Sequence, residues 1–311
     1  MNKQVIIIAG PTASGKSQLA IDTALAIGGE IVNADSMQVY KNTPIISACP
    51  TAEDKAKVPH HLYEIWDASK NGSVVDWLDL AVVKIREIWQ RGRVPVVVGG
   101  TGLYLDNLIN GTTPIPETKA DIREKVRQML AEKGVQSLHA MLSVFDPETG
   151  RRLSPNDTTR ICRALEVYFD TGRPLSEWHR QPMIKKLSEA VFFTVKIIPE
   201  ASELDERCYR RFEQMMTQGA VEEVRTLLLL NLNPKLPAMR ALGVPELLGY
   251  VSGKSTREEA VEEGKLHTRQ YAKRQRTWFK NKMNADLELN QCYTGQQNVP
   301  ENIIKGVKKR L

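Results

Sequence analysis

The amino-acid sequence predicts an α/β fold in which a parallel β-sheet is flanked by helices and interrupted by an all-helical insertion. Short runs of β-branched apolar residues, beginning with residues 5–9, alternate with helical patterns, as in parallel sheets that are buried on both faces. A glycine-rich loop joins the first run to the first helical pattern. A long central stretch has helical periodicity and no strand pattern, which indicates the insertion.

Length and composition indicate a globular protein. The chain has 311 residues, which suggests about two domains. Its 41% hydrophobic and 26% charged residues exclude a mainly disordered, collagen-like or coiled-coil protein. The apolar run at residues 5–10 is too short to cross a membrane, so we expect a soluble, cytoplasmic protein without a membrane partner, and a monomer by default. The four cysteines lack metal-ligand spacing, so we expect reduced thiols and no zinc site.

Strands and helices are expected to alternate through the core. The expected strands cover residues 5–9, 30–34, 94–98 and 191–198. The expected helices of the core cover residues 16–27, 74–90, 202–218, 220–230 and 257–283. After Ala285 the signals weaken.

The insertion begins at a linker-like break, the Thr-Thr-Pro-Ile-Pro sequence of residues 112–116. Helical patterns follow over residues 121–133, 135–143 and 157–171. We therefore assign residues 1–113 and 191–311 to the α/β core and residues 114–190 to an inserted helical domain.

The glycine-rich loop has the pattern of a phosphate-binding loop. It fits G-x-x-x-x-G-K-[ST] between a predicted strand and a predicted helix, the arrangement of a P-loop NTPase-like fold. Its backbone N–H groups and the helix N-terminus favour phosphate oxygens, Lys16 should reach the terminal phosphates, and the Ser17 hydroxyl should bind Mg²⁺. The residues expected to bind a di- or triphosphate are Gly10, Pro11, Thr12, Ala13, Ser14, Gly15, Lys16 and Ser17.

This motif leaves the reaction open. Enzymes that transfer phosphoryl groups commonly end another buried strand with an aspartate that helps to hold magnesium. Here the third strand ends in Gly99-Gly100-Thr101, and the aspartate is Asp35, at the end of the second strand. At the carboxyl edge of a parallel sheet Asp35 would face the phosphate loop, where it could hold magnesium or accept a proton.

A basic stretch covers residues 265–283. The chain carries 43 Lys and Arg against 37 Asp and Glu, and this stretch holds no acidic residue. Arg269, Lys273, Arg276 and Lys280 share one helix face, with aromatic residues among them. Such a face favours a polyanion such as nucleic acid, and a solvated surface helix is an equally weighted alternative.

Six motifs together resemble those of the tRNA dimethylallyltransferases. They lie at residues 10–17, 35–41, 59–62, 99–104, 156–166 and 273–278, in the order found in that family. The resemblance covers about residues 4–282 and lacks the zinc-finger extension of eukaryotic relatives, as in the compact bacterial form. It implies transfer of a dimethylallyl group from dimethylallyl diphosphate to the exocyclic amine of the adenosine immediately 3′ of the anticodon. The implied partner is the anticodon stem-loop of tRNA. The loop motif itself also permits ATP to enter as a competitor.

The resemblance also implies roles for individual residues. Asp35 is expected to orient the amine and take its proton, Arg211 and Lys16 to neutralise the diphosphate, and Thr101 to lie near the adenosine. The residues implied to contact tRNA are Asp35, Ser36, Met37, Gln38, Thr101, Arg123, Thr159, Arg160, Ile161, Cys162, Arg163, Arg240, Ala241, Leu242, Gly243, Val244, Pro245, Lys273, Arg274, Gln275, Arg276, Thr277, Trp278, Phe279 and Lys280.

Two motifs have no assigned chemistry. Val244-Pro245 stand where the family usually has Tyr and a basic residue, which affects the contacts at that edge. His60 and His61 match a family motif, and we expect a structural turn after Pro59 with one ring packed.

Three other functions stay open from the sequence. An isopentenyltransferase acting on free AMP or ATP would not need the helical insertion and the basic helix. A P-loop kinase would be expected to have a carboxylate after the third strand. A non-enzymatic RNA-binding module would not need Lys16 and Ser17 opposite Asp35.

Overall fold

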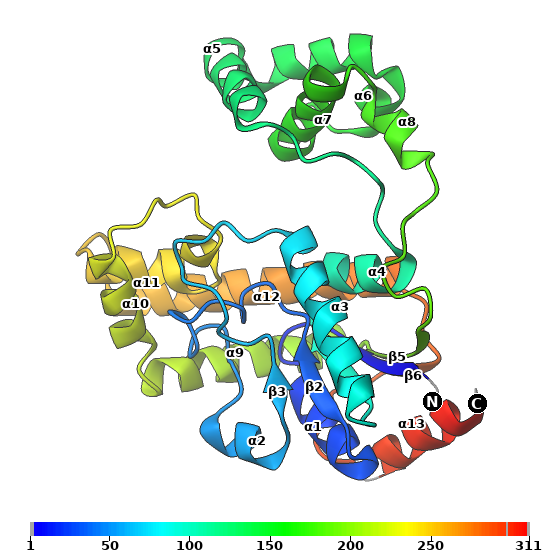
Figure 1. Cartoon of the computed structure of the whole chain (residues 1–311). Helices are drawn as coiled ribbons and strands as arrows, with labels where there is room; N and C mark the ends of the chain where they lie inside the picture. Colours follow the sequence, from blue (N-terminus) through cyan, green and yellow to red (C-terminus); the bar gives the residue numbers. More distant parts are fainter. Residues whose placement is uncertain (1–2, 297, 310–311) are drawn as a thin grey trace. The chain divides into compact units, whose positions relative to one another are not determined.

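The α/β core is built on a parallel sheet. The computed structural model describes residues 3–296 and 298–309, and among these six strands pair in the order β3-β2-β4-β1-β5-β6, parallel at each pairing (Figure 1). The α/β prediction is therefore confirmed. The strands are β1 (Gln4–Ala9), β2 (Glu30–Asn33), β3 (His60–His61), β4 (Pro95–Gly99), β5 (Val191–Ile197) and β6 (Leu287–Leu289).

Both faces of the sheet are covered. Alternate residues of β1 point to opposite sides, so Ile7 packs in one apolar cluster and Ile6 in the other. Helices α3 (Val74–Gln90) and α4 (Gly102–Asn110) cover the first face, and α1 (Lys16–Ile27) and α13 (Asn298–Lys309) cover the second. Burial on both sides explains why the strands read as continuous apolar runs.

The remaining helices of the core lie between strands along the chain. One precedes β3, and the others lie between β5 and β6. They are α2 (Ala52–Lys57), α9 (Ala201–Thr217), α10 (Ala220–Leu229), the short 3₁₀ helix η1 (Ala238–Arg240), α11 (Val244–Val251) and α12 (Arg257–Lys282).

The chain divides into two compact units. Met1–Ile109 with Leu187–Leu311 form the α/β unit, and Asn110–Lys186 form an all-helical unit. The helical unit contains α5 (Ala120–Phe145), α6 (Pro147–Arg152), α7 (Thr158–Thr171) and α8 (Leu175–His179). Gly134, with φ 73°, separates α5 into the two helical segments that the sequence predicts.

The paired histidines form a strand instead of the expected turn. His60 and His61 make up β3 and pair with Ile31 and Val32 of β2. His61 Nε2 lies 2.7 Å from the carboxylate of Glu30, which is buried at 3% exposure. Arg91 also donates to this carboxylate, at 2.7 and 3.1 Å. The histidines therefore serve the fold, because His61 helps to satisfy a buried charge at the start of β2.

Glu30→Gln is expected to lower stability and to flatten its dependence on acid pH. The Arg91 hydrogen bonds, with help from His61, lower the pKa of Glu30 below its usual value. A lowered pKa contributes stability above the unfolded pKa of about 4.3, and that contribution is lost as pH falls through the folded value. Thermal unfolding should show a cost of about 1–3 kcal/mol at pH 7 that shrinks below pH ~4. Glu53→Gln, at an exposed pair with Lys57, is the matched control; equal losses at both pH values would contradict this prediction.

Candidate active site

The phosphate-type loop lies between β1 and α1, as predicted. Ala13 and Gly15 have φ of 63° and 87°, which lets the loop turn back on itself before the helix begins at Lys16. Lys16 is buried at 8% exposure, and its Nζ donates to the carbonyl of Pro11 at 3.3 Å. Burial lowers the pKa of Lys16 to about 8, and the nearby Asp35 carboxylate opposes that shift. The lysine is thus a buried donor that an arriving phosphate would stabilise in its charged form.

Two arginines of α9 reach the same loop. Arg211 Nη1 donates to the Thr12 hydroxyl at 2.8 Å, and Arg207 Nε donates to the Ala13 carbonyl at 2.8 Å. Burial lowers the pKa of Arg211, and the Asp35 carboxylate opposes this. Arg211 was expected here from the resemblance. Arg207 was missed, although its place four residues earlier on the same helix face is a signal that could have found it.

Asp35 is held in a turn directly after β2. The Asn33 side chain accepts from the Asp35 N–H at 2.8 Å and donates to the Asp35 carbonyl at 3.1 Å. The Asp35 carboxylate in turn accepts from the Met37 N–H at 3.0 Å. These contacts fix the direction of the carboxylate, which is half-buried and lines the cavity beside Lys16 and Arg211.

Two cavities meet at this carboxylate. The larger, about 590 Å³, contains the phosphate loop, Arg207 and Arg211. The smaller, about 280 Å³, is lined by residues that include Leu242 and Arg274. The residues common to both are Thr12, Asp35, Ser47 and Arg211. A group held in the loop and a second group in the smaller cavity would therefore approach each other beside Asp35.

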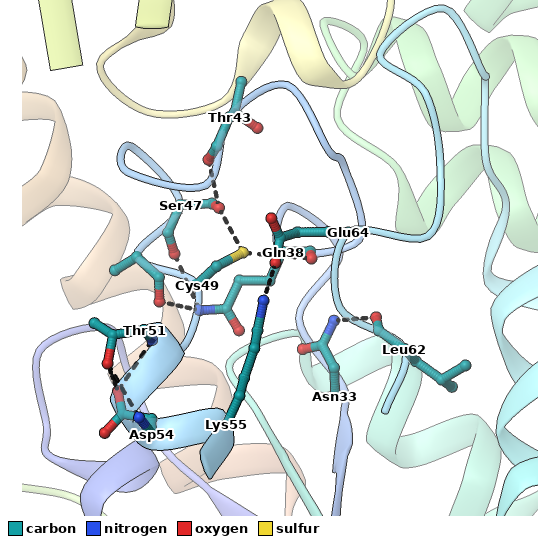
Figure 2. Close-up of polar contacts among 11 residues, drawn as sticks. Asn33, Gln38, Thr43, Ser47, Cys49, Thr51, Asp54, Lys55, Leu62 and Glu64 are labelled. Carbon is teal, nitrogen blue, oxygen red and sulfur yellow. Dashed lines mark hydrogen bonds and ion pairs between the residues drawn. The ribbon is translucent and has the colours of Figure 1, made fainter. Parts of the chain in front are cut away.

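Most residues of the segment 44–51 line the larger cavity and form one of its walls. The Gln38 side-chain amide donates to the carbonyls of Ser47 and Ala48 at 3.0 and 2.7 Å. The Ser47 hydroxyl donates to the Thr43 carbonyl at 2.6 Å, and the Lys55–Glu64 ion pair lies close by (Figure 2). The predicted tRNA contact Gln38 thus has its amide occupied in shaping this wall.

Thr101 supports the Asp35 turn. Its hydroxyl accepts from the Ser36 N–H at 2.9 Å and donates to the Ser36 hydroxyl at 3.1 Å. In the part of the chain that the structure describes, neither Thr101 nor Ser36 lines either of the two cavities. The structure therefore places Thr101 next to the segment that carries Asp35.

Gln275 joins α12 to the phosphate loop. It is buried at 7% exposure, its Oε1 accepts from the Thr12 N–H at 2.8 Å, and its Nε2 donates to the Gly100 carbonyl at 2.8 Å. A Cβ at residue 100 would lie only 2.5 Å from Nε2, so a larger residue there would displace the Gln275 amide from this contact. Both ends of the Gln275 amide are thus used inside the site, and the tRNA contact expected of this segment stays a prediction.

The basic face of α12 is divided between two environments. Arg269 pairs with Asp205 at 2.8 Å, and Arg276 Nε donates to the Pro199 carbonyl at 2.7 Å. Lys273 and Lys280 are exposed. Two of the four cations on this face thus dock within the chain, and the exposed Lys273 and Lys280 fit either interpretation of the helix.

Other predicted contact residues differ in exposure. Pro245 and Thr277 are exposed, Arg240 is exposed and lines the smaller cavity with Met37, and Trp278 is half-buried against Gly102. Gly243 is buried and donates its N–H to Glu246 at 3.0 Å. Four further residues of the predicted tRNA-contacting segments have buried side chains, and their contact with tRNA stays a prediction: Ile161, Ala241, Val244 and Phe279.

The helical unit carries its own basic cavity. Thr159, Arg160 and Arg163 line a cavity of about 510 Å³ that also includes Arg152 and His179. The other predicted residues of this unit are Cys162, which is half-buried, and Arg123, which pairs with Glu117 at 3.2 Å. The positive lining of the cavity suits an anionic partner.

Oxygen ligands for a cation lie at the mouth of the loop. The exposed Ser17 and the Asp35 carboxylate line the larger cavity. Hydroxyl and carboxylate oxygens suit Mg²⁺, which usually keeps several waters and binds substrate phosphates. Within the described residues no group of three or more His, Cys, Asp and Glu side chains could hold a metal by itself. Nor does a helix of residues 3–296 and 298–309 have the length and apolar character to cross a membrane.

The fold and the site define a P-loop α/β enzyme. Its phosphate loop and the Asp35 carboxylate line the larger cavity, which meets the smaller cavity at Asp35. The chain belongs to the IPP transferase family, whose model matches residues 38–282. A model described as isopentenyl transferase matches residues 3–64. The family expected from the sequence motifs is thereby confirmed.

Proteins of known name are similar to this chain over most of its length. A tRNA dimethylallyltransferase of Parvibaculum lavamentivorans is 46% identical over 282 residues, which cover 91% of this chain and 89% of the relative. The crystal structure of the tRNA isopentenylpyrophosphate transferase of Bacillus halodurans covers 100% of this chain and 98% of its own, with 34% identity and a TM-score of 0.68. A eukaryotic dimethylallyltransferase acting on tRNA covers 97% and 77%, with 29% identity and a TM-score of 0.81.

Proposed function

We propose that the protein transfers a dimethylallyl group from dimethylallyl diphosphate to the exocyclic amine of the adenosine 3′-adjacent to the anticodon in tRNA. The observation that carries this proposal is the meeting of two cavities at Asp35, one with the phosphate loop and one without. A prenyl transfer needs such a site, because donor and acceptor must meet at one carbon atom. The names of the similar proteins support tRNA as the acceptor.

The phosphate loop holds the leaving group in this reaction. As the bond from the allylic carbon to oxygen breaks, its electron pair stays on the diphosphate. Lys16 and Arg211, with the loop N–H groups, stabilise the charge that builds there. The loop thus acts on the diphosphate of the donor, and no phosphoryl group is transferred.

Asp35 serves as the base. The adenine amine supplies the electron pair for the new carbon–nitrogen bond, and its proton passes to the carboxylate. The turn held by Asn33 and Thr101 keeps that carboxylate at the junction of the cavities. The adenine enters the smaller cavity, which requires that the base leave the stack of the anticodon loop.

The tRNA is held mainly by charge. Arg240, Arg274, Lys273 and Lys280 of the α/β unit are exposed cations on or beside α12 and the smaller cavity. The basic cavity at Arg160 and Arg163 gives the helical unit a further place for phosphate. Contacts of this kind position RNA through its backbone and shape.

Mg²⁺ is the cofactor that the donor set suits, with Ser17 as its protein ligand. It would add positive charge at the diphosphate and so make it a better leaving group. The exposed Ser17 hydroxyl lies in the same cavity as Lys16, where it can reach a bound diphosphate. We propose that the reaction takes place in the cytoplasm and that the protein acts as a monomer.

Free AMP or ATP as acceptor is the second candidate, and dimethylallyl diphosphate with each acceptor separates the two. Diphosphate release should require tRNA and should be absent with AMP, ATP or tRNA whose target adenosine is replaced by guanosine. Release with AMP or ATP alone would overturn the choice of acceptor. Consumption of ATP without prenyl transfer would favour a kinase.

Gln275→Met is expected to lower the rate of transfer about tenfold or more while leaving the tRNA dissociation constant unchanged. The variant keeps the volume but loses both hydrogen bonds, to Thr12 and to Gly100, that hold the loop. The matched variant is the double substitution Lys273→Ala with Lys280→Ala, which should weaken tRNA binding. The slope of the logarithm of the binding constant against the logarithm of the salt concentration should become shallower by about 1.4. A filter-binding titration at several salt concentrations distinguishes them. If Gln275→Met weakened tRNA binding and left turnover normal, Gln275 would act in tRNA binding and not in holding the loop.

A further inference from the structure

The chain after α12 returns to the phosphate loop. β6 extends the edge of the sheet beside β5, and Cys292 and Tyr293 follow it, at 2% and 3% exposure. The Tyr293 N–H donates to the carbonyl of Ser14 at 3.0 Å. A Cβ on Gly15 would overlap the main chain of Tyr293, so the loop and this segment are in direct contact.

Separate contacts hold this segment in place. The Cys292 N–H donates to the carboxylate of Glu203 on α9 at 3.1 Å, and the Tyr293 hydroxyl donates to Asp22 of α1 at 2.6 Å. Helix α9 thus holds the segment through Glu203 and the loop itself through Arg207, one turn later. Tyr293 is anchored on two sides while its N–H meets Ser14.

The contact has a consequence for the neighbouring peptide group. In a trans peptide the C=O and the following N–H point in opposite directions. Because Tyr293 holds the Ser14 carbonyl, the Gly15 N–H is directed to the other side of the loop, and Gly15 lines the larger cavity. Arg207 holds the next carbonyl back, that of Ala13, and the N–H of that peptide, on Ser14, donates to the Pro11 carbonyl at 3.4 Å. Fixed N–H groups are what a diphosphate needs from such a loop.

We propose that Cys292 and Tyr293 form a brace that preorganises the phosphate loop, with the Tyr293 N–H as a positioning group for diphosphate binding. The brace rests on the proposed function in that diphosphate is the ligand of the loop. It lies outside residues 38–282, which the family model matches. The C-terminal segment is thereby part of the donor site.

Titration of inorganic diphosphate with Mg²⁺ into the full chain tests the brace by calorimetry. Tyr293→Pro removes the N–H that holds the Ser14 carbonyl and is expected to weaken diphosphate binding about tenfold, the upper end for one neutral hydrogen bond. Gln291→Pro, at an exposed position two residues earlier, is the matched control and should bind as the unchanged chain does. In turnover, Tyr293→Pro should raise KM for dimethylallyl diphosphate and leave KM for tRNA unchanged.

Glu203→Ala provides a second route, because it releases the Cys292 N–H without altering the segment itself. It decides the question if Tyr293→Pro does not fold, as judged by its thermal unfolding. Diphosphate binding unchanged in folded Tyr293→Pro, or in Glu203→Ala where the first does not fold, would overturn the brace. Failure of the unchanged protein to bind diphosphate would count against the proposed function instead, so the two failures are distinct.

Discussion

Asp35→Asn is expected to lower kcat for prenyl transfer by about 10²–10⁴-fold, with the tRNA dissociation constant unchanged. The asparagine keeps the shape of the side chain and can still accept from the Met37 N–H. It cannot take the proton of the adenine amine. Single-turnover transfer with enzyme in excess measures the chemical step, and filter binding measures the affinity for tRNA.

Asp67→Asn is the control for this variant, since Asp67 is exposed and its carboxylate accepts from Ser69. Its transfer rate should match that of the unchanged protein. Asp35→Asn with full turnover would remove Asp35 as the base. A parallel loss of tRNA affinity and turnover would instead give the carboxylate a role in binding.

Arg211→Met is expected to lower kcat/KM for dimethylallyl diphosphate by about 10²–10³-fold. The guanidinium faces the loop at Thr12 and lines both cavities, so its loss removes charge where the leaving group forms. Arg211→Lys should recover only part of the rate, because an ammonium lacks the planar fork of donors. Initial rates over a range of donor concentrations give the ratio directly.

Arg210→Met makes a matched control one residue away. Arg210 is exposed and pairs with Glu206 on the same helix, so its removal should leave the donor kinetics unchanged. Equal effects of the two substitutions would point to the net charge of α9. A loss confined to the tRNA KM in Arg211→Met would contradict its place at the diphosphate.

Much of the core could be predicted because its signals are local. β1, the glycine-rich loop and α1 follow one another without a gap, so their contacts are set by neighbouring residues. The break at Gly134 and the helices around it also appear in the sequence as periodic runs. Asp35 could be predicted because the carboxyl ends of parallel strands lie at the same edge of the sheet, where the phosphate loop also lies.

The rest depends on tertiary contacts that no local pattern encodes. β3 and β6 have two and three residues, too few for a strand pattern, and each exists by pairing with a longer strand. The burial of Gln275 among cations of α12 follows from the loop that it meets. The contact between Tyr293 and Ser14 could not be predicted either. The two residues are 279 positions apart, and the sequence after Ala285 has no pattern that indicates it.

The most direct test of the account is the mass of the modified nucleoside. The protein is incubated with dimethylallyl diphosphate, Mg²⁺ and an unmodified tRNA transcript, which is then digested and analysed by mass spectrometry. The account predicts one added dimethylallyl group on the adenosine 3′ of the anticodon, absent with Asp35→Asn. An unmodified adenosine there, or the group on another nucleoside, would contradict it.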